Sequence, residues 1–360
     1  MNYLLFDRLI DSKLPFVLYK LPDNEEVCMI MQETPLLQNI HHIEDIMDYN
    51  GFVISPFIQN PLIPTVLIRP DIHIKGISAI TDFLENHLPQ QEEIFSRDDR
   101  KEILNEDFNA YAKNFEIFHN ALVNKQFEKL VLSRILSVKK ELGFSIGQIF
   151  ERAITMYPNT FIYLLNTLQT GTWMGCSPEI LLAERAGEWR TTAVAGTRKT
   201  SVFPTDWNSK NIEEQQIVVK FIEEQLKKSA VEFTKESSQT ITVGDIEHYK
   251  TDFKFHLDSM KTAGLLLNDL HPTPAVCGYP KDAARQFIAA NENHERLYYS
   301  GFVGSVNIEN AVDLYVNIRC MKVSDCYLSL YAGGGLTPDS ALNDEWLETD
   351  YKLQMLLTLL

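Results

Sequence analysis

Cysteine is scarce in this sequence, and the spacings that would make it a cross-link or a zinc ligand are absent. Only five cysteines occur among 360 residues, their number is odd, and none forms a C-x-x-C pair. A disulfide framework and a zinc cluster are therefore not expected. No stretch of about 18 uncharged apolar residues occurs, and the N-terminus is interrupted by Asp7, Arg8, Asp11 and Lys13. We expect a cytoplasmic protein without a membrane segment.

Basic residues are also in deficit. The sequence has 33 Lys and Arg against 49 Asp and Glu, which gives a formal net charge of −16 at pH 7. Such a chain has no broad attraction for nucleic acid or for an anionic membrane, so neither is expected as a partner. An anionic small molecule would need a locally positive pocket.

Several common catalytic signatures are missing as well. The sequence contains no G-x-x-x-x-G-K-[ST] or G-x-G-x-x-G phosphate loop, no H-E-x-x-H zinc motif and no G-x-S-x-G hydrolase turn. Nucleotide binding is therefore disfavoured, and neither a zinc protease nor an α/β-hydrolase is expected.

The apolar pattern predicts an α+β fold in which large antiparallel β-sheets are flanked by helices. Strands joined by short turns are mixed with long helices instead of repeating as strand–helix–strand units. Residues 1–100 are predicted to form a β-rich N-terminal subdomain integrated with the main body, which comprises residues 101–360. Strands are expected at 16–21, 26–31, 51–54, 65–68, 129–138, 161–166, 172–176, 180–184, 300–307, 312–322 and 327–332, and helices at 106–126, 211–229 and from about 341.

Two motifs place a charged side chain at the start of an apolar strand. Lys129 opens the apolar strand KLVLSR, although a lysine in this position is also common at a sheet edge. The segment GCSPEILL presents Glu179 from a turn as an apolar strand begins. Burial there would raise the carboxyl pKa and make Glu179 a proton donor. By itself the segment is also compatible with an ordinary turn.

Two further motifs offer ligand-binding groups. AGTRK ends a strand at Gly196 and Thr197, where backbone N–H groups and a hydroxyl can bind a carboxylate, but a tight turn has the same pattern. In the predicted helix NIEEQQIVVKF, Glu214 precedes Ile217 and Val218 by three and four residues, so it projects with the apolar face. A carboxylate there needs a partner, either a metal ion or a buried basic side chain.

The C-terminal region contains three successive glycines, starting at Gly333, followed by a helix. Glu348 and Lys352 are four residues apart on that helix, a spacing most often seen in exposed ion pairs worth about 0.3–0.5 kcal/mol. The preceding glycine run favours a ligand site instead, because glycine permits close backbone approach.

The order of these motifs along the chain resembles the chorismate-utilising enzymes. This family includes isochorismate synthases, salicylate synthases and the synthase subunits for anthranilate and aminodeoxychorismate. The resemblance extends from about residue 106 to the C-terminus and implies a chorismate-binding catalytic domain at 101–360. It rests on KLVLSR, GCSPEILL, AGTRK, NIEEQ, HPTPAVCGYP, ERLYYSGFVG, YVNIRC, AGGGL and EWLETDYK.

The resemblance also implies roles for individual residues. Lys129 would be the base that activates water, Glu179 the general acid, and Glu214 and Glu348 the ligands of Mg²⁺. Substrate contacts would come from Gly196, Thr197, Tyr299, Arg319, Gly333 and Lys352, with the ring of His256 and the backbone near Ala275 and Val276 as walls.

The chemistry of chorismate requires these residue types. Arg319 and Lys352 can hold the carboxylate of the enolpyruvyl side chain, while Mg²⁺ bridges the ring carboxylate to two glutamates. Water attacks C2 as the C4 hydroxyl leaves, which needs a neutral amine on one side and a protonated carboxyl on the other.

Two residues favour isochorismate synthase within the family. Enzymes that use ammonia typically have glutamine in place of Lys129, and the aminodeoxychorismate type has a lysine in place of Ala195. No glutaminase subunit is therefore expected. A salicylate synthase, which also eliminates pyruvate, and a catalytically silent chorismate-binding subunit remain the alternatives. The family pattern Glu-His is replaced here by Glu214-Gln215, and Glu213 competes with Glu214 for the metal role because both face apolar helix positions. The product could feed menaquinone or siderophore biosynthesis.

Overall fold

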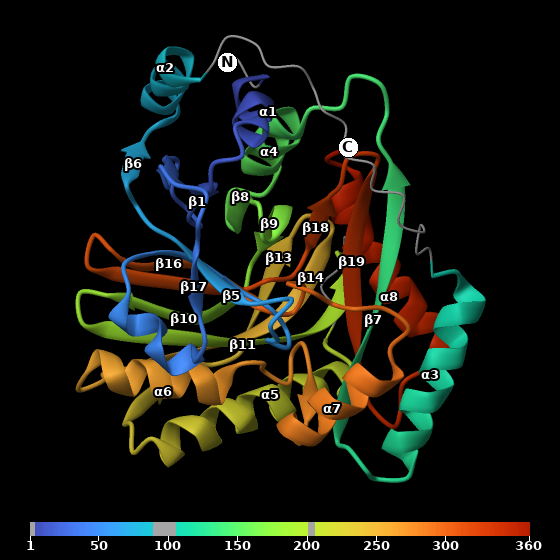
Figure 1. Ribbon diagram of the computed structural model, residues 1–360. Helices are drawn as coiled ribbons and strands as arrows, with labels where there is room; N and C mark the ends of the chain where they lie inside the picture. The colour runs from blue at the N-terminus through green and yellow to red at the C-terminus, as the bar shows by residue number, and fades with distance from the viewer. Residues whose placement is uncertain (1–3, 89–105, 201–205) are drawn as a thin grey trace.

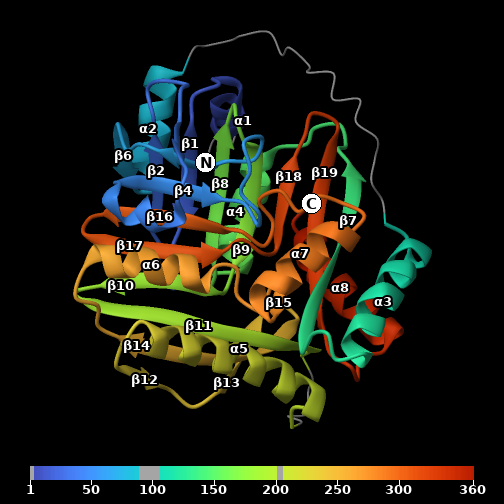
Figure 2. The same cartoon turned by 60° about the horizontal axis from the view of Figure 1, so that its bottom comes forward.

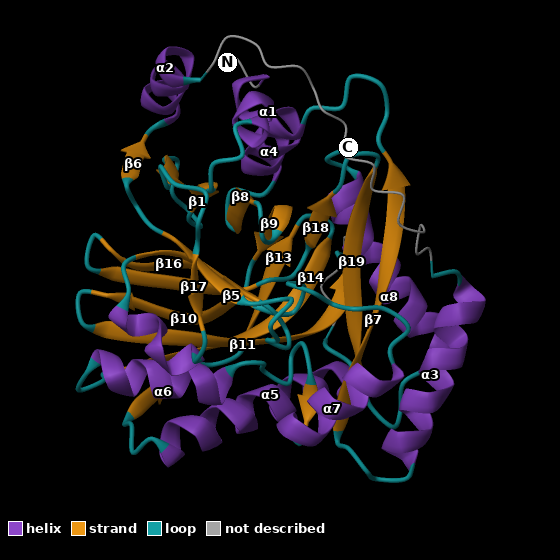
Figure 3. Ribbon diagram, viewed as in Figure 1, coloured by secondary structure: helices purple, strands orange, loops and turns teal. Residues whose placement is uncertain are grey.

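The computed structural model describes residues 4–88, 106–200 and 206–360, and contains two large antiparallel sheets with helices around them (Figures 1 and 3). The first sheet has nine strands in the order β15-β7-β19-β18-β9-β8-β1-β2-β6. These strands are β1 (Phe16–Lys20), β2 (Val27–Met31), β6 (Ile72–Lys75), β7 (Lys129–Lys139), β8 (Phe161–Thr167), β9 (Gly171–Ser177), β15 (Gly278–Tyr279), β18 (Cys320–Val323) and β19 (Tyr327–Leu336).

The second sheet has ten strands. Nine of them follow the order β12-β14-β11-β10-β17-β16-β4-β5-β3, and β13 pairs with β14 beside this path. The strands are β3 (Gln38–Ile40), β4 (Gly51–Ser55), β5 (Thr65–Ile68), β10 (Ile180–Arg185), β11 (Glu188–Lys199), β12 (Phe233–Lys235), β13 (Gln239–Val243), β14 (Ile246–Phe255), β16 (Phe302–Ile308) and β17 (Ala311–Val316).

Four of the helices begin after a residue whose side chain caps them. Asp107, Ser145, Asn208 and Ser259 each accept a backbone N–H in the first turn of the helix that follows. No helix in the described ranges is both long and apolar enough to span a bilayer. The helices are α1 (Leu4–Asp11), the 3₁₀ helix η1 (Ile43–Asp48), α2 (Ile77–His87), α3 (Phe108–Val123), α4 (Ile146–Met156), α5 (Ser209–Lys228), α6 (Met260–Leu270), α7 (Lys281–Asn291) and α8 (Leu342–Leu357).

The apolar residues form layers on both faces of each sheet. In β1, Phe16 and Leu18 pack toward α1 and α4, whereas Val17 and Tyr19 pack into the core between the two sheets. This alternation follows from the two-residue period of a strand and explains why β1 is buried along its whole length. The outer face of the ten-stranded sheet packs on η1, α5 and α6, and Figure 2 shows α5 and α6 lying along it.

Two of the places where the chain crosses from one sheet to the other lie next to each other. The first crossing, at Pro178 and Glu179, joins β9 to β10, and the second, at residues 317–319, joins β17 to β18. The crossings are hydrogen-bonded to each other, because the Val316 N–H donates to the Glu179 carbonyl (3.0 Å). The expected single strand 312–322 is therefore wrong: its halves pair with different sheets.

The α+β class with antiparallel sheets is confirmed, since all the strand pairs described are antiparallel. Residues from the first hundred contribute strands to both sheets: β1, β2 and β6 to one, and β3, β4 and β5 to the other. The expected boundary near residue 100 lies outside the described residues, so the division at this point stays a prediction.

Helix α6 packs closely on η1 at Gly264, and this generates a prediction for stability. A Cβ atom at this position would overlap the backbone oxygen of Glu44 and lie 2.9 Å from its carbonyl carbon. Gly264→Ala should therefore lower the free energy of unfolding by about 2 kcal/mol through overpacking, although alanine favours a helix over glycine by about 1 kcal/mol. Chemical denaturation measures the change. Asn268→Ala, on the exposed face of the same helix, is the control and should be neutral or slightly stabilising. Equal stability of the two variants would contradict this packing.

Candidate active site

A cavity lies beside these two crossings. It encloses about 610 Å³ of empty space, part of which opens to solvent. Backbone near Ala275 and Val276 forms part of the wall, as expected. Most of the predicted site residues also line it: Glu179, Gly196, Thr197, Glu214, Tyr299, Arg319, Gly333 and Lys352.

Glu179 is the buried acid of this cavity. Its backbone is fixed in the first crossing, where the Ser177 hydroxyl accepts the Glu179 N–H (3.3 Å) and donates to the Val316 carbonyl (2.6 Å). Its Oε1 accepts no hydrogen bond from any residue in the described ranges. Burial raises the pKa of Glu179 to about 8, and the charges of Lys129, Arg319 and Lys352 only partly oppose this rise. Glu179 is therefore largely protonated at neutral pH.

Lys129 is fully buried at the start of β7, and its Nζ lies 3.0 Å from Glu214 Oε1. Glu214 comes from the second turn of α5. Burial by itself would raise the pKa of Glu214, but the ammonium groups of Lys129, Lys210 and Lys352 outweigh burial and hold this pKa below its usual value. Glu214 is therefore a carboxylate, and Lys129 contributes the largest of the opposing charges.

The glycine run in β19 makes room for this ion pair. A Cβ atom on Gly335 would overlap Glu214 Oε1 and lie 2.6 Å from Lys129 Cε. A Cβ atom on Gly334 would lie 3.1 Å from Glu345 Oε2 and 3.5 Å from Glu348 Oε1. Carboxylates from α5 and α8 therefore meet against the bare backbone of β19.

Two lysines neutralise these carboxylates. Lys352 Nζ donates to Glu348 Oε1 and to the Gly333 carbonyl, both at 2.7 Å. Lys210 Nζ lies 2.8 Å from Glu345 Oε1 and 3.7 Å from Glu214 Oε2. Burial and the nearby charge of Glu348 raise the pKa of Glu345. Lys210 thus connects the acidic groups of α5 and α8.

The carboxylates fit a partly hydrated magnesium ion. Within the described ranges, Glu214 Oε2 and Glu345 Oε2 are buried without a hydrogen-bond partner. The same ranges contain no group of three or more His, Cys, Asp or Glu side chains arranged as a metal site, so protein groups would supply only part of a coordination shell. Mg²⁺ prefers oxygen ligands and usually keeps several waters. Glu214 and Glu348 have the chemistry for such a site, and Glu213 does not, because it is exposed on α5.

The histidine of the cavity is His248, and the expectation that His256 forms a wall is wrong. His256 follows β14, is exposed, and contacts the Gly187 carbonyl through Nδ1 at 2.8 Å. His248 lies in β14 opposite Thr197, is buried, and contacts the Gly196 carbonyl through Nδ1 at 2.9 Å. Its Nε2 contacts the Arg319 guanidinium. Burial, reinforced by the Arg319 charge, lowers the pKa of His248 well below its usual value, so the ring is neutral.

Arg319 supplies positive charge to the cavity from the second crossing. It is almost fully buried, and its Nη1 has no hydrogen-bond partner among the described residues. Burial lowers its pKa to about 10, so the guanidinium remains charged at neutral pH. Together with Lys352 it makes this cavity locally basic in a strongly acidic chain, as an anionic ligand requires.

Three residues of the site escaped the sequence analysis: Lys210, His248 and Glu345. A signal was present for two of them, since Lys210 precedes Glu214 by four residues and Glu345 precedes Glu348 by three, which places each pair on one helix face. His248 had no such signal, because its orientation depends on the pairing of β14 with β11.

The sequence matches known proteins over most of its length. A family described as chorismate binding enzyme matches residues 62–360. Isochorismate synthase EntC of Escherichia coli (strain K12) is 31% identical over 242 residues, which cover 64% of this chain and 62% of EntC. Isochorismate synthase MenF of the same organism is 27% identical over 263 residues, covering 71% of this chain and 61% of MenF. The chain thus spans about three fifths of the length of these relatives.

Solved structures share the fold. DhbC from Bacillus anthracis superposes with a TM-score of 0.79 at 22% identity, covering 99% of both chains. MenF from Escherichia coli gives a TM-score of 0.77 at 21% identity, covering 96% of this chain and 88% of MenF. Because the family match extends over most of the sequence and these neighbours share its architecture, the chain belongs to the chorismate-binding enzyme family.

Proposed function

We propose that this protein is an isochorismate synthase, which converts chorismate to isochorismate by adding water at C2 and releasing the C4 hydroxyl. The observation that carries this proposal is that a buried carboxylic acid lines the cavity and a buried amine contacts another residue of the same lining. Glu179 is an acid that keeps its proton to about pH 8, and the amine of Lys129 is buried beside Glu214, which lines the same cavity.

Two proton transfers follow from this arrangement. In its neutral form, the Lys129 amine takes a proton from the attacking water as the water oxygen bonds to C2. Glu179 gives its proton to the departing C4 hydroxyl, which leaves as water. Positioned general acids and bases of this kind each contribute about 10²–10⁴-fold to a rate.

Charged groups around the cavity supply the contacts for a dicarboxylate. We assign the carboxylate of the enolpyruvyl side chain to Arg319 and Lys352. The backbone and hydroxyl of Gly196 and Thr197, the backbone near Ala275 and Val276, and the Tyr299 and Gly333 surfaces complete the proposed contacts. His248 replaces His256 in this set, because its neutral ring orients Arg319.

When bound by Glu214 and Glu348, Mg²⁺ would supply the positive charge that holds the ring carboxylate and neutralises Glu214. The names of the relatives support isochorismate formation, and Lys129 favours water over ammonia as the nucleophile, so we propose that no glutaminase subunit takes part.

The test of this proposal is to incubate the purified protein with chorismate and Mg²⁺ and to separate the products by chromatography. Isochorismate as sole product is expected. Salicylate with pyruvate would identify a salicylate synthase, and no turnover would indicate a binding subunit. Lys129→Gln should lower kcat by about 10²–10⁴-fold, because it removes the base, while circular dichroism remains that of the unchanged protein. Full activity in this variant would refute the assignment of the base.

The metal ligands can be tested by direct Mg²⁺ titration. Glu214→Gln should weaken Mg²⁺ binding by at least about tenfold, since it removes one of two anionic ligands, and Glu348→Ala should do the same. Glu213→Gln is the matched control, because it changes the neighbouring, exposed carboxylate of the same helix. Calorimetry measures each affinity without turnover. Equal affinities in Glu213→Gln and Glu214→Gln would exclude Glu214 as a ligand.

The pKa of Glu179 predicts the alkaline limb of the activity profile. The carboxyl holds its proton below about pH 8 and loses it above, so kcat/KM should fall with rising pH through an apparent pKa near 8. Glu213→Gln should leave this limb in place. A value of kcat/KM that keeps rising from pH 8 to pH 9 would be incompatible with Glu179 as the acid.

A further inference from the structure

Among the described residues, strand β7 has no partner strand along most of one edge. It pairs with β19 over nearly its whole length, but with β15 only at its first two residues. The next backbone groups are buried, so they need other hydrogen-bond partners. The Val131 N–H donates to the Cys277 carbonyl (2.8 Å), and the Ser133 N–H donates to Glu292 Oε1 (2.8 Å). The Val131 carbonyl accepts from Arg296 Nη2 (2.7 Å). One backbone carbonyl and two side chains therefore take the place of a partner strand here.

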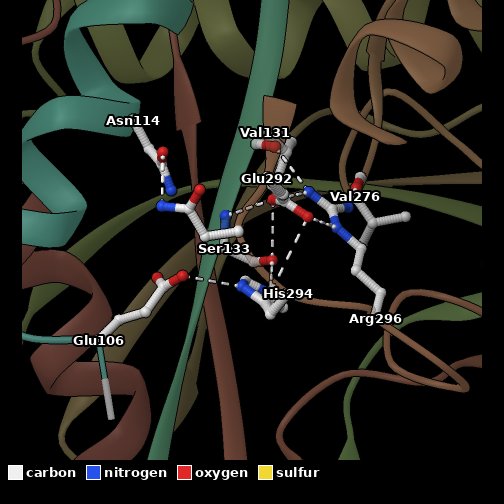
Figure 4. A network of polar contacts seen from close by, with 9 residues as sticks. Glu106, Asn114, Val131, Ser133, Val276, Glu292, His294 and Arg296 are labelled. Atoms are coloured by element: carbon white, nitrogen blue, oxygen red, sulfur yellow. Dashed lines mark hydrogen bonds and ion pairs between the residues drawn. The ribbon is translucent and has the colours of Figure 1, made fainter. Parts of the chain in front are cut away.

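All three guanidinium nitrogens of Arg296 donate hydrogen bonds in this region. Nη2 binds the Val131 carbonyl, Nη1 binds the Val276 carbonyl (2.7 Å), and Nε and Nη2 bind the two carboxylate oxygens of Glu292 (2.7 and 2.5 Å) (Figure 4). The side chain is almost fully buried, and its face lies over the Phe57 ring at 4.4 Å. The planar fork of arginine matches this set of acceptors, which lysine cannot reproduce.

The two residues whose backbone carbonyls accept from Arg296, Val131 and Val276, both line the cavity. Tyr299 lines it as well, and its N–H donates to the Arg296 carbonyl (2.9 Å). Arg296 therefore links three wall segments: its guanidinium holds Val131 and Val276, and its backbone holds Tyr299.

Further polar residues support the pair from outside. The Ser133 hydroxyl donates to Glu292 Oε1 (2.9 Å) and lies 3.0 Å from His294 Nε2, and His294 Nδ1 lies 3.1 Å from Glu106 Oε1 (Figure 4). The order Ser133, His294, Glu106 is that of a catalytic triad. However, Ser133 is fully buried and its hydroxyl is already held by Glu292, so this group is a support and not a nucleophile.

We propose that Arg296, oriented by Glu292, is a positioning residue that sets the spacing of the Val131 and Val276 walls of the substrate cavity. The inference rests on the proposed function for the identity of the substrate. It goes beyond that function in assigning substrate affinity to a residue that does not line the cavity. A misplacement of about 1 Å in such a wall can cost up to about 10²-fold in efficiency.

Arg296→Lys tests this proposal, because lysine keeps the charge but cannot bind both carbonyls and the carboxylate together. The KM for chorismate should rise about tenfold or more, while the Mg²⁺ affinity measured by calorimetry stays within about twofold. The matched control is Lys20→Met. Lys20 is also a buried cation that binds backbone carbonyls, those of Leu21, Asn24 and Pro158, but it does not line the cavity. The Lys20→Met variant should have a lower Tm and a KM within about twofold of that of the unchanged protein.

A KM for Arg296→Lys within twofold of the unchanged protein would overturn the proposal, as would an equal rise in Lys20→Met. If Arg296→Lys does not fold, Glu292→Gln serves as the test in its place. This variant keeps an acceptor for the Ser133 N–H but weakens the ion pair that orients Arg296. A raised KM in this variant supports the positioning role, and an unchanged KM refutes it. The product formed by the unchanged protein tests the proposed function separately. If there is no turnover, the dissociation constant of chorismate takes the place of KM.

Discussion

The ion pair between Lys129 and Glu214 is the interaction on which the rest of the site depends. It joins the first residue of β7 to α5 in a fully buried position, and a buried charge is stable only when it is well paired. Further lysines around Glu214 keep it ionised, and the glycines of β19 leave space for it. Burial raises the pKa of Glu179 as well, but the positive charges near Glu179 only partly oppose this rise, so Glu179 keeps its proton. Two carboxyl groups of one cavity thus differ in charge because of their neighbours.

The placement of these groups follows from the way the chain changes sheets. A short segment lies between the sheets where β9 leads to β10, and another where β17 leads to β18. Each of these two segments contributes a proposed site residue, Glu179 from the first and Arg319 from the second. Hydrogen bonds between the segments hold them in register. The two sheets therefore hold both segments from either side, and with them the side chains that we propose to contact the substrate.

Much of the fold and most of the site residues could be predicted from the sequence, because apolar alternation and short motifs are local signals. The proposed acid, the proposed base and the glycine run lie in such motifs. The sequence could not show that His248, and not His256, lines the cavity. Strand pairing decides this, because it places His248 opposite Thr197, whereas His256 lies at the Gly187 carbonyl. The break at residues 317–319 was missed for the same reason, since the apolar pattern continues across it. Gln215, where the sequence departs from the family pattern, is buried and donates to Thr251 Oγ1 (2.6 Å), a contact that no local pattern reveals.

The contribution of the first hundred residues to both sheets has a consequence for how the chain reaches its native state. β4, at residues 51–55, pairs on one side with β16, at residues 302–308, and β1, at residues 16–20, pairs with β8, at residues 161–167. During synthesis on the ribosome, the edge of β4 that pairs with β16 stays uncovered until almost the entire polypeptide has been made. Unpaired edges of apolar strands are prone to associate with other chains, and contacts so distant in sequence form slowly. Nascent copies of this protein should therefore depend on chaperones until the last third of the chain has emerged.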